Sequence, residues 1–416
     1  MSAVEPVEHP GGVRASLSLL RRNRDFRRLY LASVISLGGD WFLLVALFGL
    51  ALELSGAIAV GLVVAAQEIP FFLMSPLGGV LADRLNRKRL MIACDVIRAI
   101  LCLGFLAVHD QSTIWVALAL LAAISSFSAA FDPASSAALP NVVDSEDLGP
   151  ANALIGSLWG TMLAVGSALG GLVAATLGRE AAFTIDAASF ALSALLIAGV
   201  SRPFSEIRGP EERHPGVVEA TVETARYARR DHRVLALLGV KAGFGLGAGV
   251  IVLLSVYAER VFHQGEIGIG ILMAARGVGA LVGPFLGRSL AGRDDRRLFG
   301  VIGLALFLFG LAYAVLGLTP TLLLAAIVVS VAHLGGGAQW TLSTYGLQRI
   351  VPDRILGRVF AADQALVTLT LTASSLLTAW SANRFGPRPT SLALGAIAIA
   401  WALVWTWLTT DLRRAA

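Results

Sequence analysis

The sequence predicts an all-α membrane protein in which twelve transmembrane helices form two pseudo-symmetric six-helix bundles. Three observations lead to this prediction: the composition, a series of long apolar runs, and a repeat at half the chain length. Of the 416 residues, 56% are hydrophobic and 15% are charged, and the mean hydropathy is +0.74. A soluble domain is about 45–50% apolar and about 25% charged, so an ordinary soluble enzyme is excluded. The same hydrophobicity excludes a disordered chain.

A helix needs about 20 mostly apolar residues to cross a bilayer, and such runs follow one another along the chain. The predicted crossings are 29–52, 57–81, 90–108, 113–131, 152–177, 181–200, 234–258, 267–287, 298–318, 321–345, 359–380 and 391–409. The first run is too long for a cleavable signal and contains Asp40. We therefore expect an N-tail over 1–28, a first bundle over 29–200, a central loop over 201–233, a second bundle over 234–409 and a C-tail over 410–416.

The distribution of positive charge predicts the orientation. If the N-terminus is cytoplasmic, 26 of the 33 Lys and Arg residues lie in cytoplasmic segments and 4 lie on the opposite side. Membrane proteins place their positive loops inside. The bias therefore predicts a multi-pass protein of the cytoplasmic (inner) membrane, with both termini and the central loop in the cytoplasm. Anionic lipid headgroups are natural partners for this charge, and no nucleic-acid partner is predicted.

The two halves repeat with an offset of 208 residues, which is half of the chain. The loop residues Pro76 and Arg89 match Pro284 and Arg297 at this offset, and further matches occur before each bundle and after the fourth and tenth crossings. Parallel repeats of six helices are typical of secondary transporters, which bind their substrate between the halves near the middle of the membrane.

Residues 79–89 resemble the cytoplasmic signature loop of the major facilitator superfamily. The loop holds a Gly, the pair Asp83 and Arg84, and a cationic cluster, Arg87, Lys88 and Arg89. Segments 36–41, 139–154 and 347–360 are similar to one branch, the enterobactin-exporter-like and macrolide-efflux-like proteins. The resemblance implies alternating access, a central cavity lined by the first, fourth, seventh and tenth helices, and export of an amphipathic drug-like or siderophore-like molecule against proton entry. Residues 166–171 lack the proline of the antiporter motif in helix five.

Ionisable residues inside a membrane span are costly, so each is a hypothesis of function. The candidates for proton coupling or for the substrate cavity are Asp40, Glu68, Lys241, Arg276, His333, Gln339 and Trp340. The resemblance places Asp40, Lys241 and His333 at the cavity. Asp40 or Glu68 could exchange a proton, because burial lets a carboxylate bind and release protons near neutral pH. Alternatively, a carboxylate pairs with Arg276 across the halves, and a neutral His333 hydrogen-bonds a backbone carbonyl.

A second group of charges is expected to form a cytoplasmic gate. The predicted gate residues are Asp83, Arg84, Arg87, Lys88, Arg89, Asp132 and Asp363. Asp83 could bind a helix N-terminus of its own half or an arginine of the other half, which would hold the gate shut when the protein opens outward. The alternative is a solvated loop that only sets topology. Asp132 and Asp363 are expected to contact the loop arginines.

Two further patterns concern helix packing. Asp95 and Arg98 lie three residues apart, so a structural ion pair is expected on one helix face. Gln364, Thr368, Thr372 and Ser375 form a polar face on the eleventh helix. This face could line the cavity or form a hydrogen-bonded seam with a neighbouring helix.

Motifs of enzymes are missing from the sequence. There is no phosphate-binding G-x-x-x-x-G-K-[ST] loop, no Cys/His metal cluster and no G-x-S-x-G element. We therefore expect no enzyme activity and no cofactor, and a monomer driven by a proton gradient that carries a small-molecule substrate. A lipid or lysolipid transporter of the same fold is the main alternative; an intramembrane enzyme or a passive channel fits less well.

Overall fold

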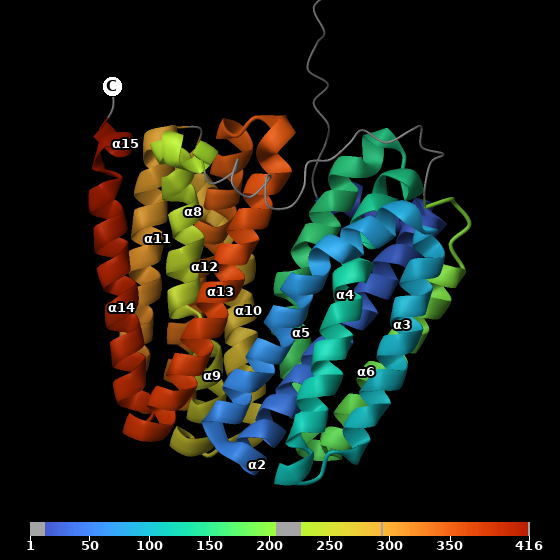
Figure 1. The fold of residues 1–416 in the computed structure, drawn as a ribbon, viewed down its shortest axis with the longest axis horizontal. Coiled ribbons are helices and arrows are strands. Elements are labelled where there is room, and N and C mark those ends of the chain that lie inside the picture. The colour runs from blue at the N-terminus through green and yellow to red at the C-terminus, as the bar shows by residue number, and fades with distance from the viewer. Residues whose placement is uncertain (1–12, 205–225, 293, 415–416) are drawn as a thin grey trace, which may run out of the picture.

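The computed structural model describes residues 13–204, 226–292 and 294–414, which form two helical bundles side by side (Figure 1). Parts of the predicted tails and residues 205–225 of the predicted central loop lie outside the described residues. The first bundle contains α2 (Arg24–Arg84), α3 (Arg87–Leu103), α4 (Ile114–Val142), α5 (Leu148–Leu177) and α6 (Arg179–Ala198). The second contains α8 (His232–Gly247), α9 (Val250–Val256), α10 (Gly265–Ala291), α11 (Asp295–Leu316), α12 (Leu322–Ile350), α13 (Asp353–Phe385) and α14 (Pro387–Leu408).

Helix α2 makes two crossings. Its 61 residues would extend about 90 Å if they were straight, three times the thickness of the hydrocarbon layer. The backbone reverses at Gly56, whose φ of 74° suits a residue without a Cβ. Eleven helical stretches in the described part of the chain can cross a membrane, and α2 counts among them once. The predicted twelve crossings are therefore confirmed.

Several helices extend beyond the predicted crossings. Helix α4 continues to Val142, so Asp132 lies about 15 Å from its end rather than at the end. Helix α13 begins at Asp353, which places Asp363 equally deep. The predicted crossings were too short because each was ended at the first charged or proline residue of an apolar run. A helix can continue through such a residue.

Close packing joins the halves at one end. A Cβ at Gly171 of α5 would lie 2.9 Å from Gly270 of α10, and one at Gly61 of α2 would lie 2.9 Å from Ala379 of α13. Figure 1 shows that the ribbons of the two halves diverge toward the end that carries α1 (Val13–Arg22) and α15 (Thr410–Arg414). We call the region between the halves at that end the opening.

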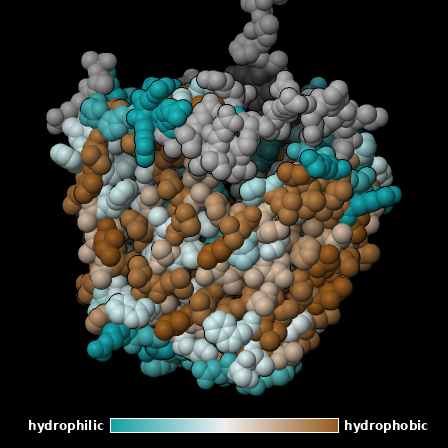
Figure 2. All heavy atoms as spheres, in the orientation of Figure 1, coloured by the Kyte–Doolittle hydropathy of each residue, from teal (hydrophilic) through white to brown (hydrophobic). Residues whose placement is uncertain are grey.

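The surface fits a membrane environment. Figure 2 shows hydrophobic side chains over the middle of the viewed face and hydrophilic ones at its two ends. Many large apolar side chains on the helices are exposed, among them Leu195, Leu323 and Trp407. Exposed apolar area of this extent is unfavourable in water and favourable against lipid tails.

Candidate transport site

An ion pair forms the polar centre of the first bundle. Arg98 and Asp95, both on α3 and both buried, make the ion pair expected from their spacing. Ser193 of α6 donates to Oδ2 of Asp95 at 2.7 Å. The guanidinium carbon of Arg98 lies 4.5 Å from the ring centre of Phe131 and 4.3 Å from that of Phe190. Cation–π contacts with two rings help to hold this guanidinium in place.

Three further carboxyl groups lie near this pair. Asp40 of α2, Asp132 of α4 and Asp186 of α6 lie within electrostatic range of Arg98. Asp186 is fully buried and accepts a hydrogen bond from Cys102 at 3.2 Å. Asp40 is half-buried and Asp132 is exposed. Asp95 is the carboxyl group that forms an ion pair with Arg98. We call Arg98 and the four carboxyl residues the Arg98 cluster. The sequence analysis expected Asp132 to contact the loop arginines; in the structure it lies within electrostatic range of Arg98.

A second polar centre lies in the C-terminal bundle. Nε of Arg276 on α10 donates to Nε2 of His333 on α12 at 3.1 Å. Because arginine cannot accept a hydrogen bond, Nε2 is the acceptor, and the neutral ring carries its proton on Nδ1. Nδ1 lies 2.9 Å from the hydroxyl of Tyr313 and 3.4 Å from the carbonyl oxygen of Val329. The expected contact of His333 with a backbone carbonyl is confirmed, and the arginine contact is additional.

Glu68 and Arg276 lie on opposite halves of the molecule. The two side chains lie within electrostatic range of each other. Their positions differ by 208 residues, the offset of the internal repeat, so they are equivalent positions of opposite charge. The half-exposed ring of Trp159 on α5 lies 5.5 Å from the guanidinium carbon of Arg276. Charged groups of both halves therefore lie in the same region of the interior.

Lys241 and Asp363 form a buried pair inside the second bundle. Nζ of Lys241 lies 3.5 Å from Oδ2 of Asp363 and 3.4 Å from the ring centre of Trp340, and it donates to Thr344 at 3.3 Å. This position corrects the expected contact of Asp363 with the loop arginines. Gln339 is fully buried, and neither atom of its amide group has a hydrogen-bond partner among the described residues.

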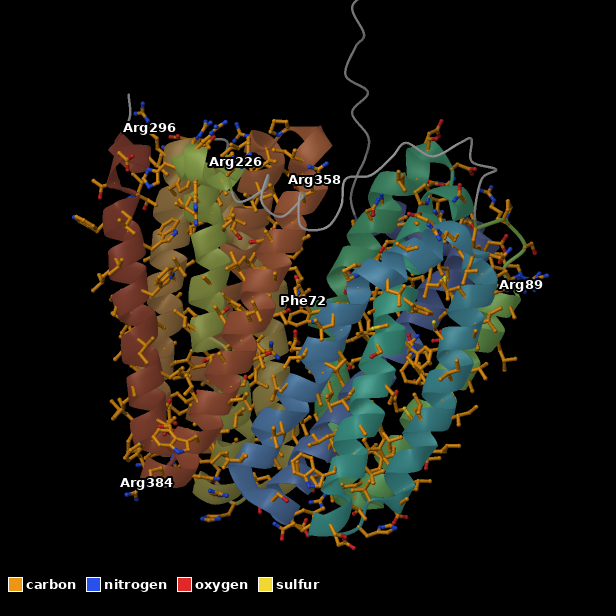
Figure 3. The ribbon with its side chains drawn as sticks, viewed as in Figure 1. Phe72, Arg89, Arg226, Arg296, Arg358 and Arg384 are labelled. Atoms are coloured by element: carbon orange, nitrogen blue, oxygen red, sulfur yellow. The ribbon has the colours of Figure 1, made fainter. Side chains whose placement is uncertain are left out.

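The signature loop is attached to its own half. Asp83 lies 3.6 Å from Arg87. Arg87 is buried and donates to the carbonyl oxygens of Ala137 and Phe204, at 2.8 and 3.2 Å. Lys88 donates to the carbonyl of Val200 at 2.7 Å. Arg84 and Arg89 are exposed, and Figure 3 shows Arg89 at the outer edge of the bundle, whereas Phe72 lies between the halves.

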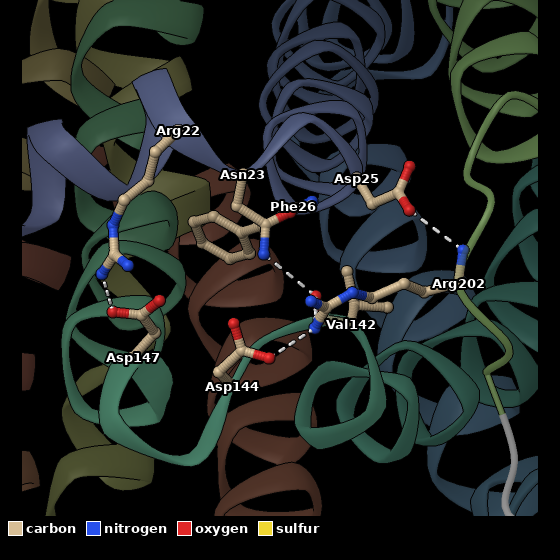
Figure 4. Close-up of polar contacts among 8 residues, drawn as sticks. All are labelled: Arg22, Asn23, Asp25, Phe26, Val142, Asp144, Asp147 and Arg202. Carbon is tan, nitrogen blue, oxygen red and sulfur yellow. Dashed lines mark hydrogen bonds and ion pairs between the residues drawn. The ribbon is translucent and has the colours of Figure 1, made fainter.

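More ion pairs join segments at the same end of the first bundle (Figure 4). Arg22 of α1 pairs with Asp147, and Arg202 pairs with Asp144 at 3.0 Å. Asp25 accepts from the backbone nitrogens of residues 201 and 202, at 3.0 and 2.9 Å. The sequence analysis did not find these contacts, because the partners are far apart in the chain.

An ion-pair network closes the opposite end. Arg179 of α6 lies 2.6 Å from Glu53 of α2 and 2.5 Å from Glu266 of α10. Its Nε also donates to Glu266 at 2.7 Å. This network, which we call the Arg179 latch, joins the two halves and was missed in the sequence. The available signal was that Arg179 is one of the few cations expected on that side.

The chain matches a family model described as "Transmembrane secretion effector" over residues 15–414. The chain belongs to this family. It is 26% identical over 354 residues to a protein of Bacillus subtilis named as the bacilysin exporter BacE. The alignment covers 84% of this chain and 86% of that protein. It is also 26% identical to the multidrug efflux pump Tap of Mycobacterium tuberculosis, over 90% of both chains, and to macrolide efflux protein A of Streptococcus pyogenes, over 81% and 84%.

Solved transporters share the fold of this family member. A bacterial homolog of the human lysosomal transporter Spinster, in an inward-facing and unoccupied conformation, superposes with a TM-score of 0.73 at 16% identity, covering 95% of this chain and 99% of that chain. The nucleoside transporter NupG superposes with a TM-score of 0.74 at 14% identity, covering 92% and 99%. The predicted major facilitator fold and the resemblance to macrolide-efflux-like proteins are confirmed.

Proposed function

We propose that this protein exports a drug-like small molecule across the cytoplasmic membrane by alternating access and that protons entering the cell drive the export. The similar proteins named for export of bacilysin, macrolides and several drugs support the direction and the class of cargo. A siderophore cargo has no such support. The observation that carries the proton coupling is the Arg98 cluster, where Arg98 pairs with Asp95 and three more carboxyl groups lie within its electrostatic range.

The cluster suits proton exchange because its net charge changes by one unit each time a carboxyl group binds or releases a proton. One guanidinium cannot neutralise four carboxylates in a medium of low dielectric constant. Asp40 and Asp132 are accessible, whereas Asp95 and Asp186 are buried. The accessible pair can therefore exchange protons with the opening while the buried pair holds Arg98 in place. Release of a proton restores a negative charge on the wall of the first half, and uptake removes it.

Orientation follows from the positive-inside bias. We place both termini and the central loop in the cytoplasm, so the opening faces inward and the Arg179 latch lies outside. The protein works as a monomer, and its cytoplasmic cations contact anionic lipid headgroups. In the outward-open form the halves would close on the cytoplasmic side, where Asp83 and the exposed Arg84 and Arg89 would reach the other half.

The experiment is proton-driven accumulation of erythromycin in everted membrane vesicles. We expect that Asp40→Asn abolishes accumulation while the purified variant retains the melting temperature of the wild type. Glu180→Gln is a matched control, because it neutralises an exposed carboxylate at the end of α6 remote from the cluster. Unchanged accumulation in the Asp40 variant would contradict the role of Asp40. A proton gradient that drives no accumulation by the wild type would contradict the proposed function.

A further inference from the structure

Helix α13 presents a face of buried hydroxyl groups without partners. Thr368, Thr372 and Ser375 lie four and three residues apart, so they share one face of the helix. They are exposed by 1%, 6% and 0%. None of the three hydroxyl oxygens has a hydrogen-bond partner within the described part of the chain. This excludes the hydrogen-bonded seam that the sequence left open and favours a wall of the transport path.

Neighbouring hydroxyl groups on the same helix behave differently. Thr370 donates to the carbonyl oxygen of Leu366 at 2.6 Å, and Ser374 donates to that of Leu246 at 2.5 Å. Serine and threonine in helices commonly satisfy their hydroxyl groups in this way. A buried hydroxyl without a partner is unfavourable. Three on one face therefore indicate a partner that comes from outside the chain.

The hydroxyl face leads into the centre of the protein. Ala379 continues this face by four residues and packs on Gly61 of α2 at the closed end. The second crossing of α2 runs antiparallel to α13. About 10 Å further along both helices, Glu68 and Thr372 lie at the same depth. At this depth Glu68 lies within electrostatic range of Arg276 of the other half.

We propose that Thr368, Thr372 and Ser375 form a hydrogen-bonding wall for the cargo, which contacts them when α2 and α13 separate. This inference rests on the proposed export function and defines its cargo class. Hydroxyl groups both donate and accept, and the face spans about 10 Å. The wall therefore fits an amphiphile that carries several hydroxyl, ether or amide groups along one side. Charge on the cargo is not needed at this face.

The first test is thermal unfolding, which requires no cargo. Thr368→Val/Thr372→Val removes two unpartnered hydroxyl groups with little change of shape, so we expect an unchanged or higher melting temperature. Thr370→Val is the matched control, because it removes a satisfied hydroxyl from the same helix. A melting temperature of the double variant below that of Thr370→Val would show that the two hydroxyl groups bond within the protein, which would overturn the proposal.

The second test compares two cargo probes in everted vesicles. Erythromycin carries many oxygen atoms, whereas tetraphenylphosphonium has no hydrogen-bonding group. We expect the double variant to raise the KM for erythromycin at least tenfold, since the loss of one hydrogen bond of about 1.4 kcal/mol corresponds to a factor of ten. Transport of tetraphenylphosphonium should not change. If the double variant lost transport of both probes equally, or of neither, the proposed hydrogen-bonding wall would be overturned. If the wild type exported neither erythromycin nor tetraphenylphosphonium, the proposed function itself would be contradicted.

Discussion

Removal of Arg179 should open the end of the molecule that is closed in this structure. The side chains of Arg179 and Glu266 are 25% and 17% exposed, and two nitrogens of the guanidinium contact the same oxygen. Opposite charges about 4 Å apart attract by about 4 kcal/mol at an effective dielectric constant near 20. Desolvation and side-chain ordering reduce the net contribution to about 1–2 kcal/mol. Glu53 is 63% exposed and adds little.

A loss of about 1–2 kcal/mol changes the ratio of two states by a factor of about 5–30. We expect Arg179→Ala to shift the protein toward the conformation in which this end is open. Distances between spin labels at His109→Cys and Leu318→Cys would report it, because both positions are exposed and the native Cys94 and Cys102 are buried. Double electron–electron resonance in lipid nanodiscs should then show a new population at longer distance.

Two controls test the cause of this shift. Arg384→Ala removes an exposed cation at the same end, whose ring contact is with the adjacent Phe385, and should leave the distances unchanged (Figure 3). The charge swap Arg179→Glu with Glu266→Arg should restore part of the closed population. Identical distance distributions for Arg179→Ala and the wild type would refute the argument that the ion pairs hold the halves together.

Three further changes test the interior and the ends of the bundles. Asp95→Asn should destabilise the first bundle by about 1.5–3 kcal/mol, because Arg98 would lose its direct charged hydrogen bond; a thermal-melt loss no larger than that of Asp132→Asn would contradict this. Lys241→Met and Asp363→Asn should each lower the melting temperature, and the double variant should recover part of the loss; additive losses would rule out coupling. Arg233 lowers the pKa of Asp231, which caps α8, so this cap should weaken as the pH falls below about 4. Hydrogen exchange in the first turn of α8 would show this, and Asp231→Asn should remove the pH dependence.

The sequence predicted the crossings well because each crossing is a local property of about 20 consecutive residues. The reversal at Gly56 lay where two apolar runs meet, and the pairing of Asp95 with Arg98 followed from helical spacing. The position of charged residues along the helix axis was predicted less well. Asp132 and Asp363 were placed at helix ends, because the end of an apolar run was taken for the end of a helix.

Contacts between distant segments could not be derived from one sequence. Glu53, Arg179 and Glu266 lie on three helices, and nothing local indicates that they meet. Whether the hydroxyl groups of Thr368 and Thr372 have partners likewise depends on neighbouring helices. The relation of Glu68 to Arg276 was present in the repeat offset, but opposite charges at equivalent positions are not visible to a search for identical residues.

Opposite charges at Glu68 and Arg276 make the two lobes complementary rather than interchangeable. If two copies of the first lobe assembled about the same axis, two glutamates would face each other, and two copies of the second would oppose two arginines. Either arrangement carries like-charge repulsion in the protein interior. The two halves are thus electrostatically complementary, which favours packing of each half against the other half of the same chain over packing against a second copy of itself.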